Sequence, residues 1–462
     1  MPAVAVLCGL ALAGGVVAVV ARQGDDSYPD EWDPRVLELV EFVEEQRNLS
    51  FEHPVHVDFL TADEYADVTR SEDTDLTDDG LAELDDLESF LRALGMVQGD
   101  LDLLDAFNEL TDSGTLAFYD PVDERVTARG TEMTTDLEVT LVHELTHVAQ
   151  DQAFDIERLQ RSDSAGGFVA VRALLEGDAI RIEERYVQTL SPEERQSYDA
   201  ARTATTAGAE AALADVPPIV FASFQAPYEF GVPFVRALEA DDGDAAINDA
   251  FDEPPASEEH LVDATRYFAG DGVRTIESPD LPDGADELDR GQLGSVGWFL
   301  LLAERIDAQE ALTAIDGWGG DEYLLYREDD ATCVQATFEG DSSGDVDEMA
   351  AAVDAWAAAL PAGMVTIEPS DVRVSFVSCD PGPEADLGVT GLSVEALALP
   401  IVRAHLLAGA LHEFDGDLAF CVADTTARSF SLAELADPSA AIVQDGRLEE
   451  AGQQAGRDCG AT

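Results

Sequence analysis

At 462 residues the chain is too long for one ordinary hydrophobic core, so its length predicts two or three domains. Its composition is globular, with 46% hydrophobic residues, and excludes a disordered, low-complexity protein. The 97 acidic residues outnumber the 25 basic ones, none of which is lysine. The formal net charge of −72 argues against nucleic acid as a partner, because so few cations cannot neutralise phosphates.

The acidic residues are scattered along the chain rather than gathered into one tail, as in Ser71–Asp86, Glu239–Asp252 and Asp280–Asp289. This pattern predicts a solvated acidic surface whose self-repulsion is relieved by salt. A saline, halophilic habitat is one explanation of the charge. Coding bias is an alternative explanation of the missing lysine.

The first predicted element is the apolar run Pro2–Ala21, which is long enough to span a bilayer or to form the core of a signal peptide. It lacks the basic residues that normally precede such a run, and Arg22 follows it. We expect residues 1–22 to be a signal peptide or membrane anchor and residues 23–33 to be an acidic linker. The chain is then extracellular, either secreted or associated with the cell membrane through residues 2–21.

Apolar spacing and turn signals predict three helices, one strand and one hairpin between the linker and residue 130. In chain order they are a helix at Pro34–Gln46, a strand at Val55–Leu60, a helix opened by a Thr61–Glu64 capping box, a helix at Leu81–Leu94, and a hairpin of Thr115–Tyr119 and Arg125–Arg129.

Residues 135–316 are predicted to be mainly helical. Thr135 stands three residues before Glu138, which is the spacing of a second capping box, and a broad apolar face follows. A long amphipathic helix is predicted at Phe168–Val187.

Residues 317–462 are predicted to form a smaller, separate α+β domain. Their alternating pattern indicates strands at Tyr323–Tyr326, Val372–Val377 and Leu418–Val422 and helices at Val346–Ala359 and Ser393–His412.

This last section also contains four cysteines, Cys333, Cys379, Cys421 and Cys459. An even number of cysteines in an exported chain predicts two disulfides, with three connectivities open. No pair has the short spacing of a zinc ribbon or finger, so we do not expect these cysteines to bind a metal.

The segment His143-Glu144-Leu145-Thr146-His147 is the clearest chemical signal in the sequence. Its His-Glu-x-x-His spacing puts both imidazoles on one face of a helix, where they can bind one zinc ion. Glu144 can then take the proton of a metal-bound water that attacks a carbonyl. A random chain with 7 histidines and 97 acidic residues contains this pattern about 0.02 times, so chance is a poor explanation. The alternative is a solvated helix face without a function.

A catalytic zinc site needs a third protein ligand and an open position. We predict Glu176, because its helical neighbours are mostly apolar and a carboxylate there is costly to bury without a partner. The alternative for Glu176 is an ion pair with Arg172. Weaker ligand candidates are Asp151, Asp178 and Glu183. Either aspartate could instead accept the free ring N–H of a ligand histidine.

Two segments, His143–Gln152 and Leu175–Ala179, carry a resemblance to a known family. Their sequences, HELTHVAQDQ and LEGDA, resemble a family of poorly characterised exported bacterial zincin-like metallopeptidases of the gluzincin type. The resemblance extends to two further segments, Pro227–Gly231 and Gly317–Asp321.

The resemblance implies an α+β fold with a zincin-like metallopeptidase domain at residues 34–316 that is mostly helical after the zinc motif. It implies Glu144 as the general base. The ligands of Zn²⁺ that it implies are His143, His147 and Glu176. Better-known gluzincins often place an aspartate four residues after the third ligand, whereas this chain has Ile180 there.

The oxyanion of a tetrahedral intermediate needs a hydrogen-bond donor, for which Tyr228 and His260 are candidates. A structural role is the alternative for both.

The hairpin before the motif offers an exposed strand with which an extended peptide could pair. The histidines interpreted as surface or packing residues are His53, His56, His405 and His412.

The sequence thus predicts an exported zinc metallopeptidase that hydrolyses a peptide or protein substrate. One alternative is a catalytically inactive cell-surface binding or assembly protein on a zincin scaffold. The intact Glu144 argues against it, because a structural metal has no use for a base beside an open position. Another is an acidic surface-layer protein with a fortuitous motif, which would bind no zinc.

Overall fold

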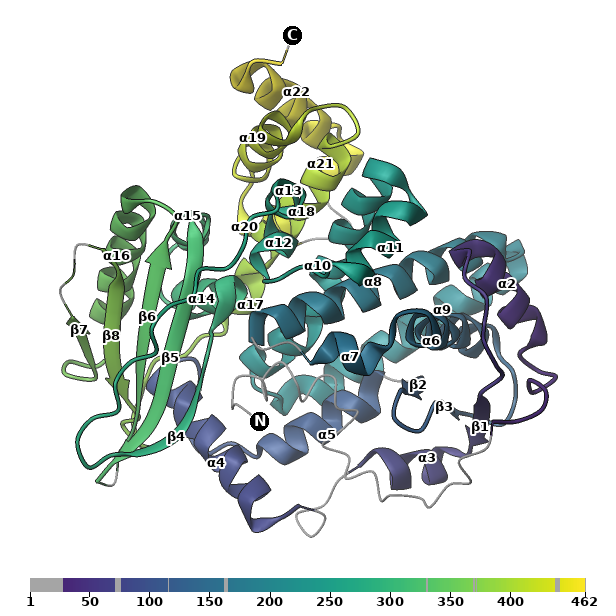
Figure 1. Cartoon of the computed structure of the whole chain (residues 1–462), viewed down its shortest axis with the longest axis horizontal. Helices are drawn as coiled ribbons and strands as arrows, with labels where there is room; N and C mark the ends of the chain where they lie inside the picture. The colour runs from purple at the N-terminus through teal and green to yellow at the C-terminus, as the bar shows by residue number, and fades with distance from the viewer. Residues whose placement is uncertain are drawn as a thin grey trace.

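Figure 1 shows the computed structural model of the chain, which describes residues 28–70, 76–114, 116–161, 165–329, 331–368, 370, 372–436 and 441–461. The expected signal or anchor segment and the first five residues of the expected linker lie outside the described residues. Helices and two β-sheets make up the described chain, which confirms the α+β class.

The smaller sheet precedes the motif helix and contains β1 (His56–Leu60), β2 (Ala117–Asp120) and β3 (Arg125–Arg129). Its order is β1-β3-β2, with β1 parallel and β2 antiparallel to the central strand. The predicted strand and hairpin are therefore confirmed. The motif helix α6 (Thr135–Phe154) packs against β2, which lies at the edge of the sheet.

Residues 135–316 were predicted to be mainly helical, and helices dominate this range up to residue 270, but residues 271–293 contain no helix and include the strand β4 (Asp286–Gly291). The helices before the second sheet are α2 (Leu37–Arg47), α3 (Ala62–Thr69), α4 (Asp78–Ala93), α5 (Leu103–Gly114), α6, α7 (Ile156–Gln160), α8 (Ala165–Thr189), α9 (Pro192–Ala212), the short 3-10 turn η2 (Leu213–Asp215), α10 (Pro218–Asp242), α11 (Asp244–Asp252), α12 (Glu259–Val262) and α13 (Ala264–Ala269). The long helices α8 and α10 pack side by side through the middle of the molecule (Figure 1).

One of the two predicted capping boxes is confirmed. The hydroxyl of Thr61 accepts a hydrogen bond from the backbone N–H of Glu64, whose carboxylate accepts one from the N–H of Thr61. The predicted box at Thr135 is wrong, because Thr134 is the N-cap residue of α6 and makes no side-chain cap bond. The carboxylate of Glu138 is bonded to the side chain of Tyr186 instead.

The second sheet has the order β4-β5-β6-β8-β7, with each pair antiparallel. Its strands are β4 (Asp286–Gly291), β5 (Trp318–Glu328), β6 (Ala331–Gly340), β7 (Val365–Glu368) and β8 (Val374–Cys379). The helices beside them are α14 (Gly294–Ala303), α15 (Ala308–Ile315) and α16 (Ser343–Ala358). Strand β4 pairs with β5 although it lies upstream of residue 317, where we expected the second domain to begin.

The end of the chain is helical, and its helices α19, α21 and α22 stand above the rest of the molecule in Figure 1. Its helices are α17 (Leu392–Ala396), α18 (Ala398–Ala410), α19 (Gly416–Ala427), α20 (Leu432–Leu435), α21 (Ala441–Gln444) and α22 (Arg447–Cys459). The predicted strand at Leu418–Val422 is wrong, because these residues lie in α19. Their burial follows a helical period, with Ala419, Val422, Ala423 and Thr426 facing inward.

Two hydrophobic clusters form most of the interior. The larger one joins α8 and α10 to the second sheet and includes Phe230, Trp298 and Phe376. The smaller one joins α2, the three-stranded sheet and the apolar side of α6, and includes Ile182 of α8. Helix α8 therefore borders both clusters, and the larger cluster draws on the chain on both sides of residue 317.

Two disulfides are present, as predicted, and their connectivity is now defined. Cys333 is bonded to Cys379 across the neighbouring strands β6 and β8, and Cys421 is bonded to Cys459 between α19 and α22. Both bonds are compatible with a secreted protein.

One described segment, Leu392–Ala410, has the length and composition of a membrane span, but it is 50% buried within the protein, as a core helix is.

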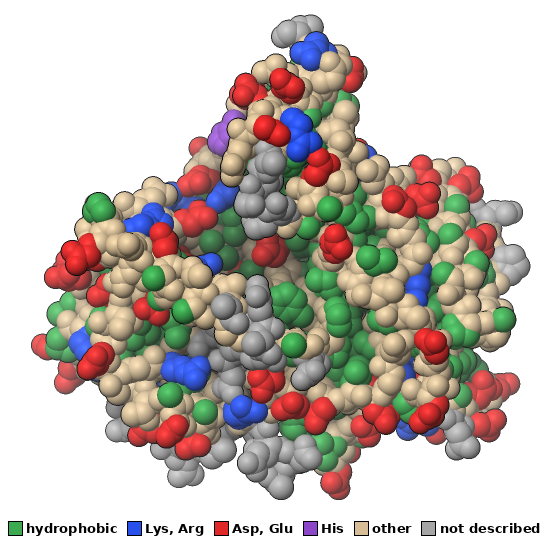
Figure 2. Space-filling model, turned by 180° about the vertical axis from the view of Figure 1, so that it is seen from behind, with side chains coloured by type: hydrophobic (Ala, Val, Ile, Leu, Met, Phe, Trp, Pro, Cys, Tyr) green, Lys and Arg blue, Asp and Glu red, His purple; other side chains and the backbone are tan. Residues whose placement is uncertain are grey.

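Acidic side chains are spread over the whole face shown in Figure 2, with fewer arginines between them.

Two further carboxylates are buried at the start of α14. Asp321 accepts hydrogen bonds from the N–H groups of Leu293 at 2.7 Å and Gly294 at 3.1 Å. Glu258 accepts one from the N–H of Val296 at 2.9 Å. Burial raises the pKa of Glu258 to about 8, and repulsion from Asp321 contributes to this shift.

We predict that Glu258 makes the folded chain less stable as the pH rises. Its folded-state pKa of about 8 exceeds the ordinary 4.5, so the free energy of unfolding should fall as the pH rises from 4.5 to 8. Glu258→Gln keeps an acceptor for the Val296 N–H and removes the titration. Above pH 8 it should be more stable than the wild type, by on the order of a few kcal/mol.

Urea unfolding at about pH 5 and about pH 9 measures this difference. The matched control is Glu277→Gln, which changes an exposed glutamate and should follow the wild type at both values. Equal pH dependence in Glu258→Gln and the wild type would contradict the prediction.

Candidate metal centre

The three predicted ligands come from two helices and converge on one point. His143 and His147 lie four residues apart on α6, with their Nε2 atoms 3.1 Å apart. Glu176 lies on α8, and its Oε2 is 3.2 Å from Nε2 of His143 and 3.5 Å from Nε2 of His147. The three ligand atoms all lie within 4.8 Å of one another, so a single ion can contact each of them.

The outer nitrogens of both rings are already hydrogen-bonded. Nδ1 of His143 is 3.3 Å from Oε2 of Glu183, and Nδ1 of His147 is 2.9 Å from Oε1 of Gln150. Because both partners are acceptors, we assign the ring hydrogen of each histidine to Nδ1, which leaves the Nε2 lone pairs facing the shared centre. Two imidazole nitrogens and one carboxylate oxygen fit a zinc ion with one open position.

The aspartates expected beside the histidine rings lie elsewhere. Asp178 accepts a hydrogen bond from Nε2 of Gln150 at 3.0 Å and reaches His147 only through that amide. Asp151 accepts a hydrogen bond from the hydroxyl of Tyr119 at 2.7 Å. The prediction that either aspartate contacts a ligand ring is therefore wrong.

The actual ring partners have a recognisable spacing. Gln150 lies three residues after His147, and Glu183 lies seven residues after Glu176, so each is on the same face of its helix as the ligand. This spacing could have identified both residues. Ile180 leaves no polar group at the position where better-known gluzincins often have an aspartate, and Glu183 is the partner of His143 instead.

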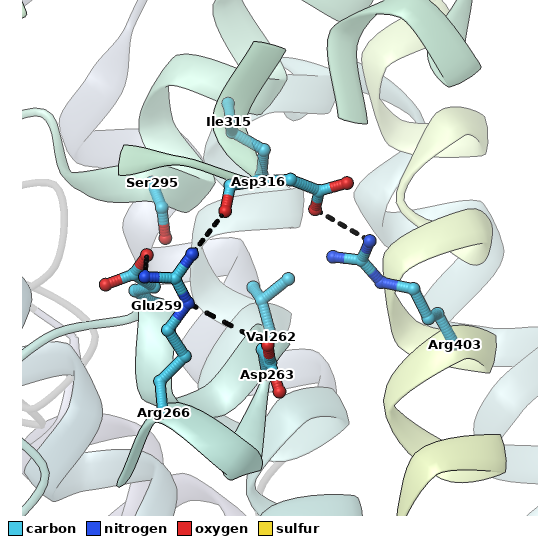
Figure 3. Close-up of a pocket in the computed structure, with 8 residues that line it drawn as sticks. All are labelled: Glu259, Val262, Asp263, Arg266, Ser295, Ile315, Asp316 and Arg403. Atoms are coloured by element: carbon cyan, nitrogen blue, oxygen red, sulfur yellow. Dashed lines mark hydrogen bonds and ion pairs between the residues drawn. The ribbon is translucent and has the colours of Figure 1, made fainter. Parts of the chain in front are cut away.

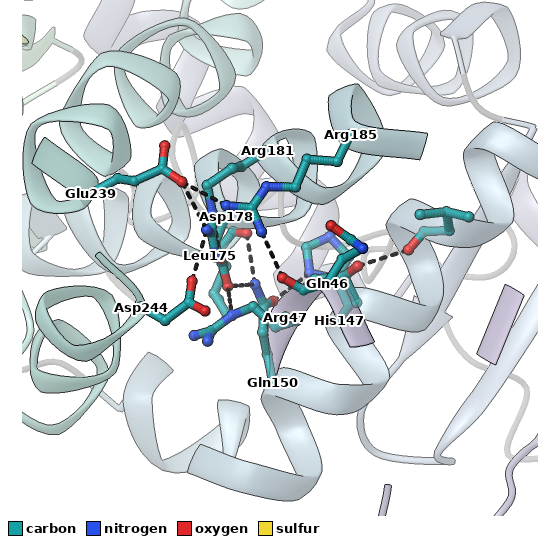
Figure 4. A network of polar contacts seen from close by, with 12 residues as sticks. Gln46, Arg47, His147, Gln150, Leu175, Asp178, Arg181, Arg185, Glu239 and Asp244 are labelled. Atoms are coloured by element: carbon teal, nitrogen blue, oxygen red, sulfur yellow. Dashed lines mark hydrogen bonds and ion pairs between the residues drawn. The ribbon is translucent and has the colours of Figure 1, made fainter. Parts of the chain in front are cut away.

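A buried ionic network supports Gln150 (Figure 4). Asp178 is fully buried and accepts hydrogen bonds from Nε of Arg47 at 2.6 Å and from Nη2 of Arg181 at 2.9 Å. Burial opposes the charge of Asp178, but Arg47 and Arg181 outweigh that effect and lower its pKa. Arg47, on helix α2 and 131 residues before Asp178 in the sequence, thus supports the orientation of His147 through Asp178 and Gln150.

Glu144 lies next to His143 on α6, and only 8% of it is exposed. Burial raises its pKa, while the neighbouring His143 and His147 act in the opposite direction. The backbone N–H of Tyr119 on β2 donates a hydrogen bond to its carboxylate. The edge strand of the small sheet is therefore in contact with the predicted base.

The ion pair that was the alternative for Glu176 is also present. Nε of Arg172 lies 3.5 Å from Oε1 of Glu176, the oxygen other than the one facing the histidines. Nη2 of Arg172 donates a hydrogen bond to the hydroxyl of Tyr228 at 3.1 Å. Burial and the charge of Glu176 raise the pKa of Tyr228. Of the two candidate oxyanion donors, Tyr228 lies near the centre, whereas His260 bonds the backbone oxygen of Asp271.

Helices α8 and α10 approach so closely at one point that only glycine fits on either side. A Cβ atom on Gly177 would lie 2.2 Å from the backbone oxygen of Gly231, and one on Gly231 would lie 2.1 Å from that of Ala173. The contact holds Tyr228, one turn before Gly231, against the part of α8 that carries Glu176.

A small cavity lies apart from this centre, among α12, α13, α15 and α18 (Figure 3). Arg266 pairs with Glu259 at 3.3 Å, and Arg403 pairs with Asp316 at 2.7 Å. None of the residues of the zinc motif lines it. The residues that do are Glu259, Val262, Asp263, Arg266, Ser295, Ile315, Asp316 and Arg403.

Residues 281–386 match a family described as a domain of unknown function, DUF8575. This segment contains β4 to β8 with α14 to α16, and none of the residues of the metal centre. Neither the curated proteins nor the solved structures give a significant match.

We predict that Gln150→Met raises the dissociation constant for zinc about 10- to 100-fold, because His147 loses the acceptor that orients its ring. The measurement is a competition titration with a zinc chelator. Gln188→Met, an exposed change on α8, is the control and should leave the constant unchanged. An unaltered constant in Gln150→Met would remove Gln150 from the support of the centre.

We also predict that Gly231→Ala lowers the free energy of unfolding by about 1–3 kcal/mol, because the added methyl group meets the backbone of α8. Chemical unfolding measures the change. The matched control is Gly208→Ala on α9, where no atom lies within 4 Å of the added methyl group. This control should be slightly more stable than the wild type, since alanine favours helix. Equal stability of the two variants would mean that α8 and α10 can separate at no cost.

Proposed function

We propose that the chain is a zinc-dependent metallopeptidase in which His143, His147 and Glu176 hold the metal and Glu144 is the general base. One observation carries the proposal. Three ligand atoms from two helices lie within 4.8 Å of one another beside a buried glutamate. The hydrogen bonds of Glu183 and Gln150 to the outer ring nitrogens favour the same assignment.

Bound zinc supplies a water of lowered pKa and polarises the scissile carbonyl. Glu144 takes the proton from the attacking water and delivers it to the leaving amine. Burial raises the pKa of Glu144, and a raised pKa suits a carboxylate that must accept a proton and then release it. Tyr228 already receives a hydrogen bond from Arg172, so its own hydroxyl hydrogen is free to stabilise the oxyanion.

Strand β2 is the proposed support for an extended substrate. It lies at the edge of the small sheet, and the N–H of its Tyr119 contacts Glu144. An extended peptide paired with this edge would lie beside the base. The proposed location is outside the cell, with the two disulfides and the acidic surface as support.

Metal content and peptide cleavage test the proposal. The full chain, purified in high salt, should hold one zinc ion by mass spectrometry, and both His143→Ala and Glu176→Ala should lose it. Glu144→Gln should keep the zinc while its kcat/KM on a peptide library falls about 100- to 10,000-fold, because the base is gone.

Each outcome points to a different conclusion. Loss of zinc only in His143→Ala would mean that Glu176 is not the third ligand. Zinc binding with no cleavage, and with Glu144→Gln equal to the wild type in every assay, would favour a binding or assembly protein on a zincin scaffold. A wild type that takes up no zinc would contradict the proposal.

A further inference from the structure

Arg172 is a buried cation beside the proposed metal centre whose guanidinium is only partly bonded. Its side chain is 3% exposed, and its Nη1 has no hydrogen-bond partner. Its one carboxylate contact is the 3.5 Å approach of Nε to Glu176. A buried guanidinium with an unbonded nitrogen is costly, because the N–H donors of that nitrogen are removed from water and gain no acceptor in its place.

Other arginines that are similarly buried form close ion pairs with carboxylates. Arg181 contacts Asp178 at 2.9 Å, and Arg403 contacts Asp316 at 2.7 Å. In a chain with 97 acidic residues and 25 basic ones, an acidic partner was available for nearly any position. Nitrogens without a hydrogen-bond partner also occur in the buried Arg47 and Arg403, so what sets Arg172 apart is its carboxylate contact, which is longer than theirs.

The carboxylate that Arg172 does contact has a second task in the proposed function. Oε2 of Glu176 faces both ligand histidines, so its charge would be shared with the metal. The remaining neighbours of the guanidinium are aromatic, with the rings of Phe224 and Tyr228 at 5.8 Å and 5.3 Å. These rings stabilise a cation less than a carboxylate does, which leaves Arg172 able to bind an incoming anion.

We propose that Arg172 binds a carboxylate of the substrate next to the scissile bond. The planar guanidinium would use Nη1 and the second hydrogen of Nη2 to hold both carboxylate oxygens. The carboxylate comes either from the C-terminus of the peptide, which would make the protein a carboxypeptidase, or from an acidic side chain. This inference rests on the proposed metallopeptidase function.

Equilibrium binding tests this proposal without catalysis. The protein is the full chain with zinc bound and Glu144→Gln, and calorimetry in high salt measures its affinity for three acetylated alanine pentapeptides. One has a free C-terminus, one is amidated, and one is amidated with a single internal aspartate. We expect the amidated alanine peptide to bind about 10-fold or more weakly than at least one of the acidic peptides.

Adding Arg172→Gln should remove this preference while the zinc content stays unchanged. Arg172→Lys keeps the charge and should retain part of the preference, which guards against a fold defect in the glutamine variant. The control is Arg236→Gln, which changes an exposed arginine of α10 that pairs with Glu184, and should keep the full preference.

The pattern of affinities decides between the sources of the carboxylate. Tightest binding of the free C-terminus supports a carboxypeptidase, and tightest binding of the aspartate peptide supports an internal acidic site. Equal affinity of all three peptides overturns the proposal, as does an equal loss for all three in Arg172→Gln. The proposed metallopeptidase function is judged separately by zinc content and by cleavage in the Glu144-containing protein.

Discussion

The contact between α8 and α10 at Gly177 and Gly231 sets the geometry on which the candidate centre depends. Two helix backbones can meet this closely only where both lack a side chain, so the crossing point is fixed in position and angle. The approach places Tyr228 beside the turn of α8 that carries Arg172 and Glu176. The other end of α8 reaches the small hydrophobic cluster beneath the motif helix.

The second organising feature is the placement of the few arginines in the interior of the protein. Arginines are rare in this chain, and several of them lie inside it rather than on its acidic surface. Arg47 and Arg181 neutralise Asp178, which in turn orients Gln150. Breaking such a buried pair leaves an uncompensated charge, so these contacts specify one arrangement of the surrounding helices.

Local spacing was sufficient to predict the parts of the centre that belong to one helix. The histidines of α6 converge because four residues make about one helical turn, and Glu176 was identifiable as a carboxylate on an apolar stripe. Arg47 could not be predicted, because its partner Asp178 is 131 residues away and only the tertiary fold joins them. Leu418–Val422 was mistaken for a strand because a short apolar segment fits both periods.

The link from Arg47 to His147 limits how far the chain can be shortened. The zinc motif begins at His143, and a fragment cut just before the small sheet would contain every proposed ligand. That fragment would lack α2 and leave Asp178 with one arginine in place of two. A piece that keeps both arginine partners of Asp178 must therefore include α2, although α2 supplies none of the proposed ligands.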